Sequence, residues 1–371
     1  MKKVKVMLAG IGGYGDGYLR RLIELSDRGE VSVEGLVEPY WQSCKRLDEI
    51  RARGFTIYDS LDEFYAEKSC DLAVISTPIQ FHTRMIKKAL SCGSNVLCEK
   101  PLTGDVRDID ELISARDESG RFVMIGYQWS HSAAILAMKR DILAGVYGEP
   151  QRLKTMVLWP RNKAYFNRGT GWAGKLRDSD GTLILDSVAN NATAHYLHNI
   201  FFTLGGAPDR SLEPDKIEAE LYRANPIENF DTAIISCGFA NGAESLFIAS
   251  HSTERGFEPA FEYRFSKGVL EFSETGERNI IGRLDSGELR DYGDPFADQL
   301  NKLNIAVANV GAEHPFIPCG IETASAQVKC IAECAKQPII DFPESRKRIG
   351  DGELTYIDGL YGELVERYKN W

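Results

Sequence analysis

The feature that most constrains the fold of this chain is the regular alternation of strand-like and helix-like patterns over residues 1 to about 125. Apolar residues at helical spacing, such as Leu19, Leu22 and Ile23, separate the strand-like runs. The runs lie at 4–8, 31–37, 70–77, 95–100 and 121–127. The run CDLAVIST is almost continuously apolar, as expected for a strand covered on both faces. This alternation predicts an α/β domain with a doubly wound parallel sheet, which we place at residues 1–126.

A different pattern follows in residues 127–371. Strand-like runs with turn signals between them lie at 217–224, 232–239, 244–251, 260–265, 269–274 and 279–284. The pair Asn241-Gly242 separates two of these runs and is a strong hairpin signal. Helical patterns lie around 191–203, 295–309 and 321–335. We therefore predict an α+β domain with a large, open, mostly antiparallel sheet that carries helices on one face.

Composition narrows the class of protein. The 371-residue chain has a net charge of −10, which argues against nucleic acid as a partner. No apolar run approaches the roughly 20 residues of a membrane span, and the N-terminus is interpreted as a strand and glycine turn rather than a signal peptide. Eight cysteines without a CxxC pair predict reduced thiols in a cytoplasmic protein. Cys330 and Cys334, four apart on a predicted helix, are assigned to packing rather than metal binding, and we predict no metal site.

A glycine-rich turn follows the first strand-like run. The sequence GIGGYG has GxGxxG spacing, in which the first glycine makes the turn and the second lets a diphosphate approach the backbone. The third glycine lets the next helix pack closely on the strand, and the N–H groups at that helix's start favour phosphate. The predicted dinucleotide-binding turn comprises Gly10, Ile11, Gly12, Gly13, Tyr14 and Gly15. The alternative is a purely structural turn.

Glu38 ends the second strand-like run. It follows the turn at close to the spacing of about 20 residues expected for an acid that binds the ribose diol. A carboxylate there would repel a 2′-phosphate, so we predict NAD as the cofactor. Lys45 and Arg46 lie nearby and keep NADP as the alternative.

Polar residues also follow two later strand-like runs, at the carboxyl ends where doubly wound sheets bind ligands. In CEKPL, Glu99, Lys100 and Pro101 lie at the end of the run that begins at residue 95. Lys100 would there be a positioned cation; the alternative is a solvated loop lysine. The sequence STP at 76–78 ends another run, and His82 follows it on the next helix.

TPxxxH followed by EKP, after an N-terminal GxGxxG, resembles the Gfo/Idh/MocA oxidoreductases, named for glucose-fructose oxidoreductase and inositol dehydrogenase. GYQWSHSAAI (126–135) and GVYGEP (145–150) lie where that family enters its second domain, so the resemblance covers nearly the whole chain. It implies a Rossmann domain and NAD(P)-dependent hydride transfer at a sugar or cyclitol hydroxyl. It also implies a homodimer or homotetramer formed through the open sheet of the second domain.

The resemblance further implies residue roles. Lys100 corresponds to the family lysine near the nicotinamide, where a cation stabilises negative charge on the reacting oxygen and helps relay its proton. The family usually has Asn where this chain has Ile79, so one nicotinamide contact is absent or replaced, with Gln128 as the candidate. The other expected cofactor contacts are Ser76, Thr77, Pro78, His82, Glu99 and Lys100.

The stretch DSVANNATAHYLHN (186–199) resembles the family loop D-x-x-x-H, in which Asp and His reach the substrate and the His acts as base. Asp186 matches the Asp. The His position is Asn190, which cannot accept a proton at neutral pH. Asn190 would then hydrogen-bond a substrate hydroxyl, or would only cap the helix that follows.

Two explanations remain for the missing base. In the first, His195 or His198 replaces it, because Asn191, His195 and His198 would share one face of a helix, and His195 is the better placed. In the second, Asp186, Lys100 or a tyrosine manages the proton. The bland alternative is that both histidines are structural.

The segment WPRNKAYFNRGTGWAGKL (159–176) places aromatic residues among cationic ones. Aromatic faces stack on sugar C–H surfaces, and arginines donate to hydroxyls or a carboxylate. The alternative is an ordinary amphipathic loop. The predicted substrate-binding residues are Lys100, Trp159, Arg161, Tyr165, Arg168, Trp172, Asn190 and Asn191.

Together these features predict an NAD-dependent dehydrogenase that acts on a CH–OH group of a sugar, sugar derivative or cyclitol. The predicted catalytic residues are Lys100, Asp186, His195 and Asn190. One alternative keeps the fold but uses transient oxidation for elimination or glycoside cleavage. Another is a non-enzymatic, dinucleotide-binding regulator, against which the retention of Lys100 in its EKP context counts.

Overall fold

The structure, a computed structural model, describes residues 3–169, 171–273, 275 and 278–371. Residues 1–2 of the N-terminal run, Thr170 of the expected substrate loop and Glu274 of an expected strand lie outside the described residues. The chain forms two compact units. The first contains the described residues of Met1–Thr103, Arg107–His131 and Asp298–Glu322, and the second those of Gly104–Val106, Ser132–Ala297 and Thr323–Trp371. The expected domain boundary between residues 126 and 127 remains a prediction.

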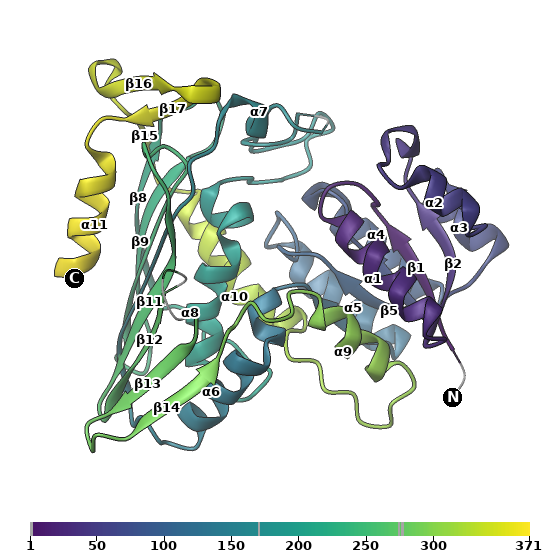
Figure 1. The fold of residues 1–371 in the computed structure, drawn as a ribbon, viewed down its shortest axis with the longest axis horizontal. Helices are drawn as coiled ribbons and strands as arrows, with labels where there is room; N and C mark the ends of the chain where they lie inside the picture. Colours follow the sequence, from purple (N-terminus) through teal and green to yellow (C-terminus); the bar gives the residue numbers. More distant parts are fainter. Residues whose placement is uncertain (1–2, 170, 274, 276–277) are drawn as a thin grey trace. The chain divides into compact units, whose positions relative to one another are not determined.

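In its described residues the first unit contains a six-stranded parallel sheet with the order β3-β2-β1-β4-β5-β6. The strands are β1 (Val4–Ala9), β2 (Val31–Val37), β3 (Ile57–Tyr58), β4 (Leu72–Ile75), β5 (Asn95–Cys98) and β6 (Val123–Ile125). The helices are α1 (Gly15–Asp27), α2 (Leu47–Ala52), α3 (Leu61–Glu67), α4 (His82–Ser91), α5 (Asp108–Ser119) and α9 (Asn301–Asn309) (Figure 1). The predicted doubly wound α/β fold is confirmed.

The core of the first unit lies where α1 packs against the sheet. Val6 and Leu8 of β1 and Leu19 and Leu22 of α1 are fully buried in one apolar cluster. Each such side chain contributes about 1.5–3 kcal/mol to the free energy of folding. Leu303 of α9 belongs to the same cluster, which explains why a segment so late in the chain is part of this unit.

Among the described residues of the second unit, nine strands form a sheet with the order β14-β13-β12-β11-β7-β10-β9-β8-β15. They are β7 (Pro150–Leu158), β8 (Lys216–Arg223), β9 (Thr232–Gly238), β10 (Glu244–Ser250), β11 (Phe257–Phe265), β12 (Gly268–Ser273), β13 (Ile280–Leu284), β14 (Leu289–Gly293) and β15 (Ile339–Asp341). The expected runs between 217 and 284 form β8 to β13. Asn241-Gly242 turns between the antiparallel strands β9 and β10, with φ of +82° at Gly242. The pairs β7–β10 and β8–β15 are parallel and the others antiparallel, so the mostly antiparallel sheet is confirmed.

Helices cover both faces of this sheet, so the expectation of helices on one face is wrong. Met156 of β7 packs in a cluster with Leu360 and Leu364 of α11. The preceding residue, Thr155, contacts Tyr263, to which Asn199 of α8 also donates. Because successive strand residues point to opposite faces, α8 and α11 lie on opposite sides of the sheet (Figure 1). The helices are α6 (Ala133–Leu143), α7 (Lys163–Phe166), α8 (Ala194–Leu204), α10 (Ile321–Cys334) and α11 (Leu360–Asn370), and a hairpin joins β16 (Lys347–Gly350) to β17 (Leu354–Ile357).

The eight cysteines are thiols rather than disulfides. Cys330 and Cys334 of α10 are buried, as is Cys237 of β9. Hydrogen bonding with Cys237 and with Cys334, together with burial, raises the pKa of the Cys330 thiol well above its ordinary value. This environment keeps the thiol protonated. In the part of the chain that the structure describes, no cluster of metal-ligating side chains is found, and no helix is long and apolar enough to cross a membrane.

Candidate functional site

The glycine turn has the geometry that the three glycine roles require. Gly10 has φ of +84°, and a Cβ added there would lie 2.3 Å from the Ser76 carbonyl oxygen after β4. A Cβ on Gly15, the first residue of α1, would lie 2.0 Å from the Gly10 carbonyl oxygen. At Gly12, by contrast, an added Cβ would meet nothing within 4 Å. The turn is therefore tight on its protein side and open where a diphosphate would approach, so it fits the phosphates of a dinucleotide.

Glu38 follows the last residue of β2 and lies against this turn. The Ile11 backbone N–H donates to Glu38 Oε2 over 3.3 Å, and the Tyr40 N–H donates to Oε1 over 3.1 Å. The carboxylate is therefore held at the turn, where an acid that binds a ribose diol is needed. Arg46, one of the two cations that kept NADP as the alternative, is paired with Asp16 and Glu49. The other, Lys45, is exposed.

Glu99, expected as a cofactor contact, is buried in a charged cluster of the first unit. Lys302 of α9, itself fully buried, is ion-paired with Glu99 and donates to the Gly126 carbonyl oxygen over 2.9 Å. The Tyr18 hydroxyl donates to Glu99 Oε1 over 2.7 Å. Burial favours a raised pKa for the Glu99 carboxyl, but the charge of Lys302 outweighs it and lowers the pKa. Burial likewise favours a lowered pKa for the Lys302 ammonium group, but the negative charge of Glu99 acts against it and the lysine pKa is raised.

Glu99, which is ion-paired with Lys302, lies next to Lys100 in the chain. The Lys100 backbone N–H donates to Glu99 Oε2 over 3.3 Å, and the Lys100 side chain is half-buried. Lys100 therefore follows a buried carboxylate whose charge is already balanced by Lys302. The sequence motif identifies Glu99 and Lys100, but it does not identify Lys302, which lies 203 residues after Glu99.

His82 connects the two loops that follow β4 and β5. Its Nδ1 lies 2.8 Å from the Pro101 carbonyl oxygen and its Nε2 lies 2.9 Å from the Thr77 carbonyl oxygen. The ring is fully buried, and burial lowers the pKa of His82. We interpret His82 as a positioning residue that holds the STP and EKP loops together, rather than as a direct cofactor contact.

The remaining expected cofactor residues lie at the same carboxyl ends. The Ser76 N–H donates to the Ala9 carbonyl oxygen over 2.7 Å, and Thr77 Oγ1 donates to Met85 Sδ over 3.4 Å. Pro78 follows directly, and Ile79 is buried. Gln128 is also buried, in a short 3-10 helix (Gln128–His131) after β6. These residues share an edge of the sheet in the first unit, but their contacts with a cofactor remain predictions.

In the second unit, Asp186 fastens the loop before α8. The Gly174 N–H donates to Asp186 Oδ2 over 2.6 Å, and the Asn191 amide donates to Oδ1 over 2.8 Å. The preceding residue, Leu185, has φ of +49°, a left-handed conformation rarely adopted by branched side chains. Strain of this kind persists where surrounding contacts enforce it.

Asn190 supplies one of those contacts. Its amide donates to the Leu185 carbonyl oxygen over 3.0 Å and accepts from the Gln327 amide over 3.1 Å. Ser187, not Asn190, caps the helical segment, because its hydroxyl accepts from the Asn190 N–H over 3.1 Å. Asn190 is 1% exposed and has a structural role in this unit. Its expected substrate contact remains a prediction.

The expected shared face of Asn191, His195 and His198 does not form. A π-helical turn (Val188–Ala192) precedes α8, which begins at Ala194, so Asn191 lies outside the regular helix. The wider i→i+5 turn breaks the 3.6-residue register on which that expectation depended. His195 is 8% exposed, and His198 is fully buried and stacked on Phe202.

The expected substrate loop forms an arginine and aromatic cluster. The Arg161 guanidinium lies 5.5 Å from the Trp159 ring and 5.1 Å from the Tyr165 ring. The Arg168 guanidinium lies 3.6 Å from the Tyr165 ring and 4.6 Å from the Trp172 ring. All five residues that the sequence selected here therefore belong to one cluster, which favours a built site over a solvated loop.

His251 of the second unit, which sequence reasoning missed, lies beneath this cluster. Its ring is 5.4 Å from the Tyr165 ring, and its Nδ1 lies 2.8 Å from the Trp159 carbonyl oxygen. Burial lowers the pKa of His251 to about 3, and the charges of Arg161 and Arg168 act in the same direction. No local motif in the sequence marks this histidine, because it reaches the loop through strand pairing.

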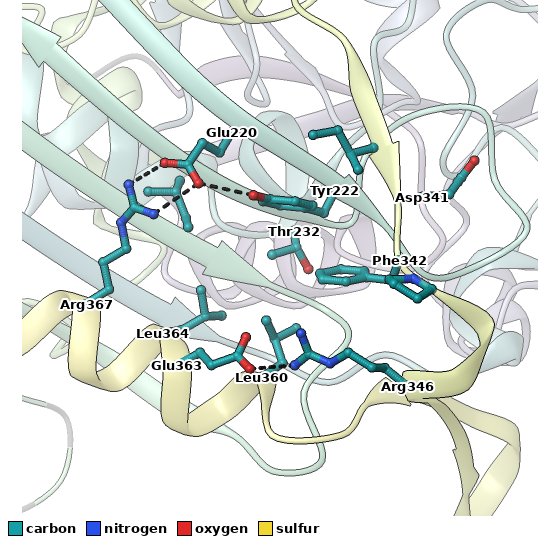
Figure 2. Close-up of a pocket in the computed structure, with 13 residues that line it drawn as sticks. Glu220, Tyr222, Thr232, Asp341, Phe342, Arg346, Leu360, Glu363, Leu364 and Arg367 are labelled. Atoms are coloured by element: carbon teal, nitrogen blue, oxygen red, sulfur yellow. Dashed lines mark hydrogen bonds and ion pairs between the residues drawn. The ribbon is translucent and has the colours of Figure 1, made fainter.

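A cavity of about 370 Å³ lies elsewhere in the second unit, where α11 crosses β8, β9 and β15 (Figure 2). Tyr222 stacks on Phe342 with 5.1 Å between ring centroids. The charged side chains that line this cavity are paired. Glu220 pairs with Arg367 and Arg346 pairs with Glu363 (Figure 2). Asp341 pairs with Arg223. None of the residues selected from the sequence lines this cavity, and its charges are already neutralised.

Comparison with known proteins gives a family match for the N-terminal part of the chain. Residues 4–127 match the Gfo/Idh/MocA model, described as "Oxidoreductase family, NAD-binding Rossmann fold". This part of the chain is therefore similar to the NAD-binding domain of the Gfo/Idh/MocA oxidoreductases. The match confirms the expected family, its Rossmann fold and NAD as the cofactor of that family.

Curated relatives match over part of their length. An uncharacterized oxidoreductase of Streptococcus pneumoniae is 26% identical over 56% of this chain and 52% of its own length. An inositol 2-dehydrogenase of Leifsonia xyli is 27% identical over 39% of this chain and 42% of its own length. The chain thus spans about half or less of the length of these family members.

Solved structures extend the likeness in fold to both units. The WlbA dehydrogenase of Bordetella pertussis, in complex with NADH and UDP-GlcNAcA, has a TM-score of 0.72 at 19% identity, covering 90% of this chain and 97% of that protein. An oxidoreductase from Agrobacterium radiobacter, in complex with NAD+, L-tartaric acid and magnesium, has a TM-score of 0.70 at 17% identity, covering 89% and 94%. At these identities the likeness shows the fold alone.

Proposed function

We propose that this chain is a Gfo/Idh/MocA member and an NAD-dependent dehydrogenase that acts on a CH–OH group of a sugar, sugar derivative or cyclitol. The observation that carries the proposal is the glycine turn, closed at Gly10 and Gly15, open at Gly12, with the Glu38 carboxylate fixed beside it. The family match and the names of the relatives, which include inositol 2-dehydrogenases, support the same class.

In this proposal the turn residues and Glu38 bind the cofactor. When bound, NAD accepts a hydride from the carbinol carbon or returns one to the corresponding carbonyl. The backbone N–H groups that follow Gly12 hold the diphosphate at the start of α1, and Glu38 accepts hydrogen bonds from the ribose diol. The negative charge at Glu38 disfavours a 2′-phosphate, so we propose NAD rather than NADP.

We propose that Lys100 stabilises the substrate oxygen. An ammonium group favours the alkoxide that develops as the hydroxyl loses its proton. His195 is proposed as the proton acceptor, and Asp186 as the residue that fixes the loop before α8.

The test is spectrophotometric turnover with NAD and with NADP over a panel of sugars, sugar acids and cyclitols. We expect NADH formation with at least one member, and a fall in kcat of at least about 100-fold in Lys100→Ala with the NAD affinity retained. Unchanged behaviour of Lys100→Ala would contradict the proposal and support a dinucleotide-binding regulator. If His195 accepts the proton, only its neutral imidazole is active, so kcat should fall on the acid side of the pH profile and this fall should be absent in His195→Asn. An unaltered pH profile would remove His195 from that role.

The oligomeric state is part of the proposal. The broad sheet of the second unit is the surface through which we propose that a homodimer or homotetramer forms. Light scattering of the intact chain would test this, and a monomer at working concentrations would contradict it.

A further inference from the structure

The arginine and aromatic cluster of the second unit carries two positive charges on one ring. The Arg161 and Arg168 guanidinium groups lie 5.1 Å and 3.6 Å from the ring centroid of Tyr165. Both side chains are half-buried. Among the residues that the structure describes, neither guanidinium is in an ion pair. Two like charges held this close repel one another, and an anion between them would remove the repulsion.

Hydrogen bonding leaves donors available on both arginines. Arg168 Nη1 donates to the Tyr165 carbonyl oxygen over 2.6 Å, which uses one of the five N–H donors of the guanidinium. Arg161 Nε is buried and has no hydrogen-bond partner among the described residues. A buried donor without a partner costs about 1–3 kcal/mol, so a ligand that accepts from it would be stabilised.

Several other cations of the same unit are already neutralised by carboxylates. Lys163, on the same loop, is paired with Glu353 over 2.8 Å. Around the cavity beneath α11, Arg346 and Arg367 are paired with Glu363 and Glu220 (Figure 2). Arg161 and Arg168 differ from these cations because no carboxylate in the described residues neutralises either of them.

The aromatic component indicates the rest of the ligand. The Tyr165 and Trp172 rings lie against the Arg168 guanidinium, and aromatic side chains also pack on the C–H surfaces of sugar rings. The planar guanidinium binds carboxylate or phosphate through paired N–H donors, whereas a neutral hydroxyl gives no charge compensation.

We propose that Arg161 and Arg168 bind the anionic group of the substrate, so that the substrate is an acidic sugar derivative, bearing a carboxylate or a phosphate, rather than a neutral sugar or cyclitol. The assignment of the ligand as a substrate rests on the proposed dehydrogenase function. The binding of the anion does not.

The test compares matched probes by isothermal titration calorimetry on the intact protein. Hexuronates supply the carboxylate, hexose 6-phosphates supply the phosphate, and the corresponding hexoses are the neutral counterparts. We expect at least one acidic probe to bind about 10- to 100-fold more tightly than its neutral counterpart. Arg161→Gln and Arg168→Gln should each reduce that ratio by about tenfold or more, and Arg168→Lys should retain part of it because the charge remains.

Lys163→Gln is the matched control, since it removes one positive charge from the same loop where Glu353 already neutralises it. We expect it to leave the affinity ratio unchanged, and retained NAD affinity shows that each variant is folded. Equal binding of acidic and neutral probes, or an equal loss in Lys163→Gln, would overturn the proposal.

Two further outcomes separate this inference from the dehydrogenase proposal. NAD-linked turnover of neutral polyols alone, with no arginine-dependent anion binding, would leave the dehydrogenase and remove the anion site. Arginine-dependent binding of acidic sugars without NAD-linked turnover of any probe would leave the anion site and remove the dehydrogenase.

Discussion

Lys302 is the residue on which the charge balance of the EKP loop depends, because it is the buried partner of Glu99. Replacing it with methionine keeps most of the volume but leaves the Glu99 carboxylate buried without its counter-charge. We expect Lys302→Met to lower the free energy of unfolding by about 3–5 kcal/mol. Urea titration of the variant measures this.

The double variant Glu99→Gln/Lys302→Met provides the control, since it removes both charges and keeps an acceptor for the Tyr18 hydroxyl. Most of the lost stability should return, because a neutral amide is far cheaper to bury than an unpaired carboxylate. A double variant as unstable as Lys302→Met alone would show that lysine packing, not charge, is what Lys302 contributes.

At the scale of the elements, two substitutions in the turn between β1 and α1 distinguish an effect on stability from an effect on cofactor binding. In Gly15→Ala the new methyl group would lie 2.0 Å from the Gly10 carbonyl oxygen, so the turn or helix must move. We expect a loss of stability of about 1–3 kcal/mol or more. In Gly12→Ala the methyl group meets no protein atom within 4 Å, so stability should stay within about 1 kcal/mol.

NAD affinity should respond differently. The methyl group of Gly12→Ala projects into the space proposed for the diphosphate, so we expect NAD affinity to fall about tenfold or more while the protein stays folded. Thermal unfolding and NAD titration of the two variants measure both quantities. Full NAD affinity in Gly12→Ala would show that the open side of the turn is not the phosphate site.

The elements also show what the sequence can predict. Apolar periodicity located the strands of the first sheet except β3, whose two residues form no pattern, and it located β8 to β13 of the second sheet. The GxGxxG spacing defined the turn because Gly10 and Gly15 each answer a local steric need. The pairing of Lys302 with Glu99 and the position of His251 depend on contacts between distant segments, which local spacing does not report. Asn190 lies in the π-helical turn before α8 and bonds to Leu185 and to the distant Gln327, contacts that a helical pattern does not report.

For the whole molecule, buried neutral histidines link folding to pH. Burial lowers the pKa of His131 to about 4 and that of His251 to about 3. In the unfolded chain a histidine titrates near pH 6.5. Below that value the unfolded state binds protons that the folded state excludes, so stability is fully present above about pH 6.5 and is lost as pH falls toward the folded-state values.

Each histidine that stays neutral in the folded state adds about 1.4 kcal/mol per pH unit to the slope of unfolding free energy between roughly pH 4.5 and 6. His131→Asn should reduce the slope by about this amount for the first unit, whatever its effect on stability at pH 7. His314→Asn is the matched control, since it removes a histidine whose side chain is 92% exposed in the folded chain. Urea unfolding across this pH range measures both slopes, and an unchanged slope in His131→Asn would mean that the folded protein admits a proton at this buried ring.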